Sequence, residues 1–235
     1  MAIDDLPMPV VNFLNVIGVP WPYVNEDTVL QFASLVRDFG TAVETTHQDA
    51  TAAIKAIGQA HQGASTERMT SGWASMSEQH VTELVDGCKV LSVALEAAAG
   101  YIVAQKVEAI AELVGMAAAF VADQAASVAT LGIAEAAVPL IIEGAEKLVE
   151  SLEADLQQYI VGELIGAAAK PLFAKVEAAM AGLDWSKTSG PGGASTGFSV
   201  DEVAVRQATG LLRSHAATLR GHGETFQQGV RGLGF

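Results

Sequence analysis

Residues 29–60 read VLQFASLVRDFGTAVETTHQDATAAIKAIGQA. Apolar or small side chains recur in this stretch at alternating steps of three and four residues. That period of 3.5 residues is typical of a helix that packs lengthwise on another helix. The stretch therefore predicts one long amphipathic helix, whose buried side is formed by Val29, Phe32, Val36, Phe39, Val43, Thr46, Ala50, Ala53, Ile57 and Ala60.

The start of this helix is marked by Asn25, which we expect to cap it, with Glu26 and Asp27 in the first turn. Acids there complement the positive end of the helix dipole. Residues 1–24 are predicted to be irregular, because prolines block a continuous helix. The segment Pro20-Trp21-Pro22 is expected to pack on the helices as an aromatic plug.

A second helical arm follows a loop near residues 62–65 and a bend at Ser71-Gly72-Trp73-Ala74-Ser75. We expect Gly72, Trp73 and Ser75 to form the bend of a long helical hairpin, 26–99, with the indole anchoring the turn. The buried side of the second arm is predicted to be Val81, Leu84, Cys88, Leu91, Leu95, Ala98 and Ile102. One cysteine in the chain excludes an internal disulfide, and Cys88 is expected in the core.

Alanine-rich helices are predicted over residues 100–183. The apolar pattern continues after Gly100 with a shifted stripe through Val103, Val107 and Val114, and whether Gly100 breaks the helix stays open. Pro139 is expected at the start of a new helix and Pro171 to kink or restart it. The acids Glu143, Glu146, Glu150, Glu153 and Asp155 are expected on its solvated side.

Residues 186–198 are rich in Gly and Ser and predict a flexible linker between a bundle, 1–185, and a C-terminal amphipathic helix, 199–235. Ser199-Val200-Asp201-Glu202 is predicted to be a capping box. Docking of this helix on the bundle or on a partner, and a plain solvated face, stay open. The proposed partner-binding residues recur every seven positions: Val205, Leu212, Leu219, Phe226 and Leu233, with Arg206, Arg213 and Arg220 one position later.

The fold class predicted from these patterns is all-α, an elongated helical bundle built on the hairpin, with further long helices and a tethered C-terminal helix. The net charge of −14 argues against nucleic acid as a partner, because phosphates would be repelled. No secretory signal is visible at the N-terminus, which carries Asp4 and Asp5. The longest uncharged runs, 113–122 and 124–134, are shorter than the roughly 18 residues of a spanning helix.

No pattern of catalytic residues stands out. The histidines do not pair at a four-residue spacing, no nucleophile elbow is present, and no phosphate-binding glycine loop follows a strand. The sequence therefore predicts no enzyme, no catalytic residues, no cofactor and no metal.

The helices flanking Trp73 resemble the WXG-type helical hairpins exported by type VII secretion systems of actinobacteria and firmicutes. Residues 20–110 are similar to the N-terminal helical domain of actinobacterial channel-and-necrotizing-toxin proteins and related polymorphic toxins. The resemblance is carried by Trp21-Pro22, by Glu26-Asp27 and by the Trp73 bend, although Trp73-Ala74-Ser75 has serine where the family has glycine. Residues 205–235 resemble the opening helix of another such hairpin.

The resemblance implies a protein secreted without a cleavable signal peptide, cytoplasmic before export, that pairs with a small helical WXG-type protein or the secretion machinery. The family export signal, Tyr-x-x-x-Asp/Glu, has two candidates, Tyr23 to Asp27 and Tyr159 to Glu163. We expect a non-enzymatic targeting or adaptor module that delivers or chaperones a toxin encoded elsewhere, as a homo- or hetero-oligomer. The alternative is a membrane-active, channel-forming domain that uses residues 113–142, where protonation of Asp123 and Glu135 would leave a nearly apolar segment.

Overall fold

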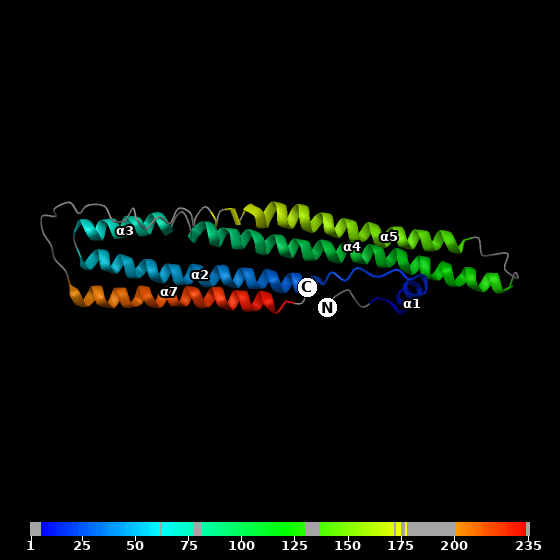
Figure 1. The fold of residues 1–235 in the computed structure, drawn as a ribbon, viewed down its shortest axis with the longest axis horizontal. Coiled ribbons are helices and arrows are strands. Elements are labelled where there is room, and N and C mark those ends of the chain that lie inside the picture. The colour runs from blue at the N-terminus through cyan, green and yellow to red at the C-terminus, as the bar shows by residue number, and fades with distance from the viewer. Residues whose placement is uncertain are drawn as a thin grey trace. The chain divides into compact units, whose positions relative to one another are not determined.

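The computed structural model describes residues 6–61, 63–77, 81–129, 137–171, 173, 174, 177 and 201–233. Over these residues the chain is helical and contains no strand, which confirms the all-α prediction (Figure 1). The elements are α1 (Met8–Ile17), α2 (Glu26–Ala60), α3 (Ala64–Met76), α4 (Thr82–Ala129), α5 (Val138–Tyr159), the π-helical η2 (Ile160–Ala169) and α7 (Glu202–Arg231). The predicted linker, 186–198, lies outside the described residues.

The chain divides into two compact units. The first contains residues 1–31 and 94–166, together with Phe235, and the second contains residues 32–93 and 167–234. Two of the boundaries fall inside long helices, between Gln31 and Phe32 in α2 and between Val93 and Ala94 in α4, and a third falls inside η2, between Gly166 and Ala167. Helix α7 belongs to the same unit as most of α2.

The predicted stripe of α2 is confirmed. Val36, Val43 and Ala50 are buried, and Phe32 and Phe39 of the same stripe are half-buried. The capping prediction is also correct, because the Asn25 side chain accepts a hydrogen bond from the Thr28 backbone N–H at 3.1 Å. At the other end of the stripe Ala60 is exposed, where the helix ends.

The hairpin of the second unit turns earlier than Trp73. Helix α2 ends at Ala60 and α3 begins at Ala64, so the reversal lies at residues 61–63, close to the predicted loop. Gly72 and Trp73 lie within α3, which corrects the prediction that they form the bend. Gly72 lies on the exposed side of α3, where a glycine costs only about 1 kcal/mol and does not end a helix.

The N-terminal region is less irregular than predicted, because α1 is a helix of ten residues. Pro9 lies in its first turn, where a missing backbone N–H costs nothing. Gly18 ends the helix in the left-handed conformation, with φ of 75°. Phe13 of α1 contacts Phe120 of α4 with ring centroids 5.3 Å apart, and Trp21 is buried as expected.

Helix α4 continues through Gly100 without a break. Gly100 is exposed, and a methyl group added there would meet nothing within 4 Å. The buried side keeps its phase along Leu95, Ile102, Ala109 and Leu113, so the predicted shift to Val103, Val107 and Val114 is wrong. The unshifted stripe passes through Lys106, a charged residue that is nevertheless fully buried.

Helix α5 lies antiparallel to α4 in the first unit. Tyr159 at the end of α5 stacks on Tyr101, whereas Gly144 near its start faces the Met116 side chain further along α4. Pro139 lies in the first turn of α5, as predicted, and the five acids predicted on its solvated side are all exposed. The helix changes to π-helical geometry at Ile160, where η2 begins. This change comes before Pro171 in the chain.

Candidate functional site

Trp73 clamps α3 onto α2. Its indole N–H donates to the Thr51 hydroxyl at 3.0 Å, and its ring stacks on the imidazole of His47 with centroids 5.3 Å apart and an interplanar angle of 15°. Thr51 in turn donates to the backbone carbonyl of His47, one turn earlier. Trp73 therefore fixes the register of the two helices through a polar contact and an aromatic contact on consecutive turns of α2.

The same indole reaches the apolar core of the second unit. Ile54 and Ile57 of α2 and Ala208 of α7 form a buried cluster there. Trp73, Met69 and Leu212 pack around it. The side chain of Ser75 lies outside the described residues, so of the three predicted bend residues only Gly72 and Trp73 have a described environment.

His47 is the titratable group of this clamp. Its Nε2 lies within hydrogen-bond distance of the Ser77 hydroxyl, and one ring face is covered by Trp73. Burial lowers the pKa of His47, because the charged imidazolium loses its hydration. The neutral ring is therefore the form that the clamp favours at physiological pH.

Helix α7 docks in cis on α2, one of the outcomes that the sequence left open. Phe226 contacts Phe39 at 5.0 Å and Phe32 at 6.4 Å between ring centroids, and His222 Nε2 lies 3.0 Å from the Thr46 hydroxyl. The backbone N–H of Asp201 donates to His61 Nδ1 at 3.2 Å. Because residue numbers rise along α7 as they fall along α2, the two helices run antiparallel.

The N-cap of α7 is Asp201, whose side chain accepts from the N–H groups of Val203 and Ala204. This places the helix start at Glu202 and makes Asp201 the capping residue, rather than the Ser199 of the predicted capping box. The predicted partner-binding residues then separate into two groups. Val205, Leu212, Phe226 and Leu233 are half-buried and Leu219 is 38% exposed, whereas Arg206, Arg213 and Arg220 are all exposed.

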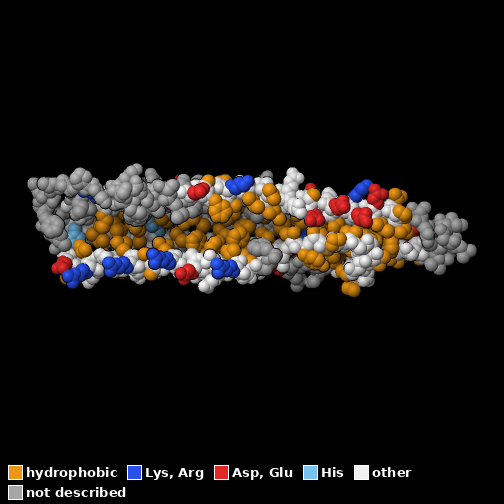
Figure 2. Space-filling model, in the orientation of Figure 1, with side chains coloured by type: hydrophobic (Ala, Val, Ile, Leu, Met, Phe, Trp, Pro, Cys, Tyr) orange, Lys and Arg blue, Asp and Glu red, His pale blue; other side chains and the backbone are white. Residues whose placement is uncertain are grey.

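Basic side chains follow one another along the outer side of α7 (Figure 2). Arg206 pairs with Glu202 one turn earlier, which is an exposed helix pair of small energetic value. Whether these arginines bind a separate partner stays a prediction.

The candidate export signal begins at Tyr159, whose ring stacks on Tyr101 with centroids 4.1 Å apart and an interplanar angle of 10°. Glu163 lies in η2, and its side chain is outside the described residues. The single recognition patch that these two side chains would form therefore stays a prediction.

The structure contains a buried ion pair that the sequence patterns do not predict. Lys106 is 0% exposed, and its ammonium group donates to Glu26 Oε2 at 3.1 Å and to the backbone carbonyl of Val24 at 2.6 Å. The pair ties the start of α2 to the middle of α4 within the first unit. A lysine at a core position of the stripe, facing an acid in a first helical turn, is the signal that could have revealed it.

Among the described residues, no group of three or more His, Cys, Asp or Glu side chains is arranged to hold a metal ion. Cys88 is buried, and burial raises the pKa of its thiol, which makes a reactive thiolate unfavourable. Among the helices that the structure describes, one stretch, Thr82–Ala125, is long and apolar enough to cross a membrane by length and composition. The buried core helix of a bundle meets the same criterion.

A family model described as the WXG100-like domain matches residues 4–143, which is more than half of the chain. The chain belongs to the WXG100-like family. Neither a curated protein nor a solved structure matches it significantly.

The WXG100-like match spans α1 to α4 and the first residues of α5, a wider range than the predicted resemblance over residues 20–110. It identifies the chain as a helical protein related to type VII secretion, from a family that is non-enzymatic. The clamp at Trp73 and the ion pair at Lys106 both lie inside the WXG100-like domain, so this domain spans parts of both compact units.

Proposed function

We propose that this chain is a non-enzymatic targeting or adaptor module of a type VII secretion system, and that it acts by pairing its helices with a small helical protein. Membership of the WXG100-like family carries the proposal. The fold supports it, because long helices with defined faces suit helix-to-helix association better than small-molecule binding. Export without a cleavable signal peptide and association with a separately encoded toxin belong to the same proposal.

The test is a pull-down of the full chain from its producing cells, with captured proteins identified by mass spectrometry. We expect a small helical protein with a WXG-type hairpin to copurify in a fixed ratio. Mass photometry of the purified complex measures that ratio. A chain that stays monomeric and captures no helical protein would contradict the proposal.

A membrane-active domain is the second candidate, and the apolar stretch Thr82–Ala125 favours it. Of the two acids in residues 113–142 whose protonation would be needed, Asp123 is half-buried and Glu135 lies outside the described residues. Liposomes loaded with a fluorescent dye test this function at neutral and acid pH. Leakage only at acid pH would support it, and intact liposomes at both would exclude it.

A further inference from the structure

The outer face of α4 carries an uninterrupted apolar seam in the first unit. Every position of the seam is exposed, and the steps alternate between three and four residues. Val107 is 52% exposed, Val114 is 43% exposed and Val121 is 66% exposed. The seam consists of Ala97, Gly100, Ala104, Val107, Ala111, Val114, Ala118, Val121 and Ala125.

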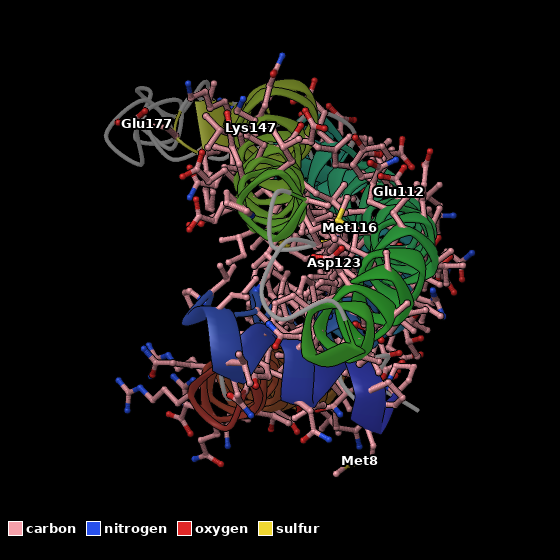
Figure 3. All side chains as sticks on the ribbon, turned by 90° about the vertical axis from the view of Figure 1, so that its right-hand side faces the viewer. Met8, Glu112, Met116, Asp123, Lys147 and Glu177 are labelled. Atoms are coloured by element: carbon pink, nitrogen blue, oxygen red, sulfur yellow. The ribbon has the colours of Figure 1, made fainter. Side chains whose placement is uncertain are left out.

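In the part of the chain that the structure describes, the seam stays exposed. The contacts of α4 within the first unit are made from its other side, where Ile102, Lys106 and Leu113 are buried. Figure 3 shows Met116 on the side of α4 that faces α5, where its side chain lies against Gly144. Helix α4 therefore has two apolar faces, and packing among the described residues does not account for the second.

The seam has the geometry of a helix-pairing surface. A spacing of 3.5 residues keeps its positions in line along a partner helix. Alanine and glycine between the valines let a second helix approach closely. At about 1.5 Å per residue, the stretch from Ala97 to Ala125 is roughly 42 Å long, which matches one long helical arm.

The charges beside the seam are acidic. Glu108 is exposed directly beside the seam, next to Val107, and Glu112, one turn further along, is exposed on the same flank of the helix. The only base between Ala94 and Ala129 is Lys106, which is buried in its pair with Glu26. A second copy of this chain would bring the same acids to the seam, and like charges would face each other across the pair in a chain of net charge −14.

We propose that the outer face of α4 binds one long amphipathic helix of a different protein, whose small and apolar residues repeat every 3.5 positions and whose edges carry Lys or Arg beside Glu108 and Glu112. This inference rests on the proposed function, because it names the surface and the chemistry of the helical partner. An anionic lipid surface is the poorer occupant, since the same two acids would repel it.

A pair of designed peptides tests the chemistry of the occupant directly. Both are helices of about 35 residues, long enough to cover the seam. They share one alanine and leucine seam, and one has Lys and the other Glu along its edges. Binding to the full-length chain is measured by fluorescence anisotropy at low and high salt, in solution and after addition of phosphatidylglycerol vesicles.

The matched variants are Val107→Asn with Val114→Asn, on the seam, and Val203→Asn, at a valine of α7 that is 65% exposed. We expect the Lys-edged peptide to bind the unmodified chain and the Val203 variant equally, and the double variant about tenfold more weakly. The Glu-edged peptide should bind about tenfold more weakly than the Lys-edged one, and salt should reduce that difference. Equal binding of both peptides, or full binding by the double variant, overturns the inference.

A photo-crosslinking residue at position 107 or 203 of the full chain in its producing cells then identifies the natural occupant. The expected product at 107, and not at 203, joins the seam to a helix of another protein with Lys or Arg beside the crosslinked position. A self-crosslinked dimer, or binding to the vesicles that the double variant loses, overturns the inference. If the pull-down captures a helical partner that the double variant retains, this surface is wrong and the proposed function stands.

Discussion

Trp73 shows how one side chain of α3 holds a neighbouring helix in register. Its indole contacts α2 through Thr51 and His47 and packs on a cluster that includes Ala208 of α7. Because the ring is half-buried, both its apolar area and its single N–H contribute to that hold.

Replacing the indole tests the two contributions separately. Trp73→Phe keeps most of the ring and loses the N–H to Thr51, so we expect a loss of about 1 kcal/mol in the free energy of unfolding. Trp73→Ala also removes the ring from the Ile54 and Ile57 cluster, and should cost roughly 2–4 kcal/mol. Urea unfolding followed by circular dichroism measures both.

The control for this prediction is Gly72→Ala, one residue earlier. A methyl group there meets nothing within 4 Å and the residue is helical, so the variant should be more stable by about 1 kcal/mol. Destabilisation by Gly72→Ala would instead mean that this position is a bend that requires glycine.

Lys106 and Glu26 form the second test at this scale. Lys106→Met leaves the Glu26 carboxylate buried without its cation, and we expect a loss of about 3–5 kcal/mol. The double variant Lys106→Met with Glu26→Leu removes both charges and should recover most of that loss. A double-mutant cycle in urea measures the coupling, and additive single effects would show that the two groups do not depend on each other.

His47 makes stability depend on pH. Its pKa is lowered in the folded chain, so below the ordinary value of about 6.5 the unfolded chain binds the proton more readily than the folded chain does. The free energy of unfolding should therefore fall as the pH is lowered from 7 through that value. The fall should be smaller in His47→Gln. Unfolding curves at a series of pH values check this, and equal slopes in the two chains would contradict it.

At the scale of the element, α2 approaches α4 closely in the second unit. A Cβ added at Gly40 would lie 2.8 Å from the Cβ of Cys88, so alanine there requires the helices to separate. We expect Gly40→Ala to cost about 1–3 kcal/mol, as overpacking does in other cores. The matched Gly100→Ala, in open space on α4, should stabilise the chain by up to about 1 kcal/mol.

Thermal unfolding of these two glycine variants should move in opposite directions. If both stabilise the chain, the close approach at Cys88 is absent in solution. If both destabilise it, helix propensity does not govern the exposed side of α4.

The elements that sequence could predict are those whose buried side is chemically uniform. The stripe of α2 from Val36 to Ile57 was readable because each buried position is apolar or small. The stripe of α4 passes through Lys106, and a lysine that is neutralised by Glu26 cannot be told from a solvated one without the partner helix. Gly72 is a related case. Its glycine predicts a bend, but a glycine marks a bend only when the surrounding helix is not held by packing.

The candidate surfaces were predictable only in part. The heptad of α7 is visible in the sequence. Its docking on α2, however, depends on contacts with Phe32 and Phe39, and the sequence allows these two residues to pack equally well on another helix. The outer seam of α4 was hidden for another reason. The spacing of its valines predicts a buried stripe, and only the exposure of Val107 and Val114 shows that they face outward.

At the scale of the whole molecule, the chain is one sequence with two compact units that share two long helices. Each unit has its own stabilising contact. In the first unit it is the buried ion pair of Lys106, and in the second it is Trp73 together with the docked α7. Local opening free energies differ between such regions when their contacts are separate. A substitution that removes the stabilising contact of one unit should therefore lower the free energy of local opening in that unit first.

Hydrogen exchange on Phe226→Ala measures this directly. The variant removes the ring that packs on Phe39, so amides of α7 should exchange faster, as should those of α2 near Phe39, while α5 keeps its rates. Arg213→Gln is the matched control, because Arg213 is exposed on the same helix and its loss should leave the exchange of α7 unchanged. Equal acceleration in α5 and α7 would show that the two units open as one. Unchanged exchange in α7 would show that the helix is not held by Phe226, and would free its apolar side for a partner.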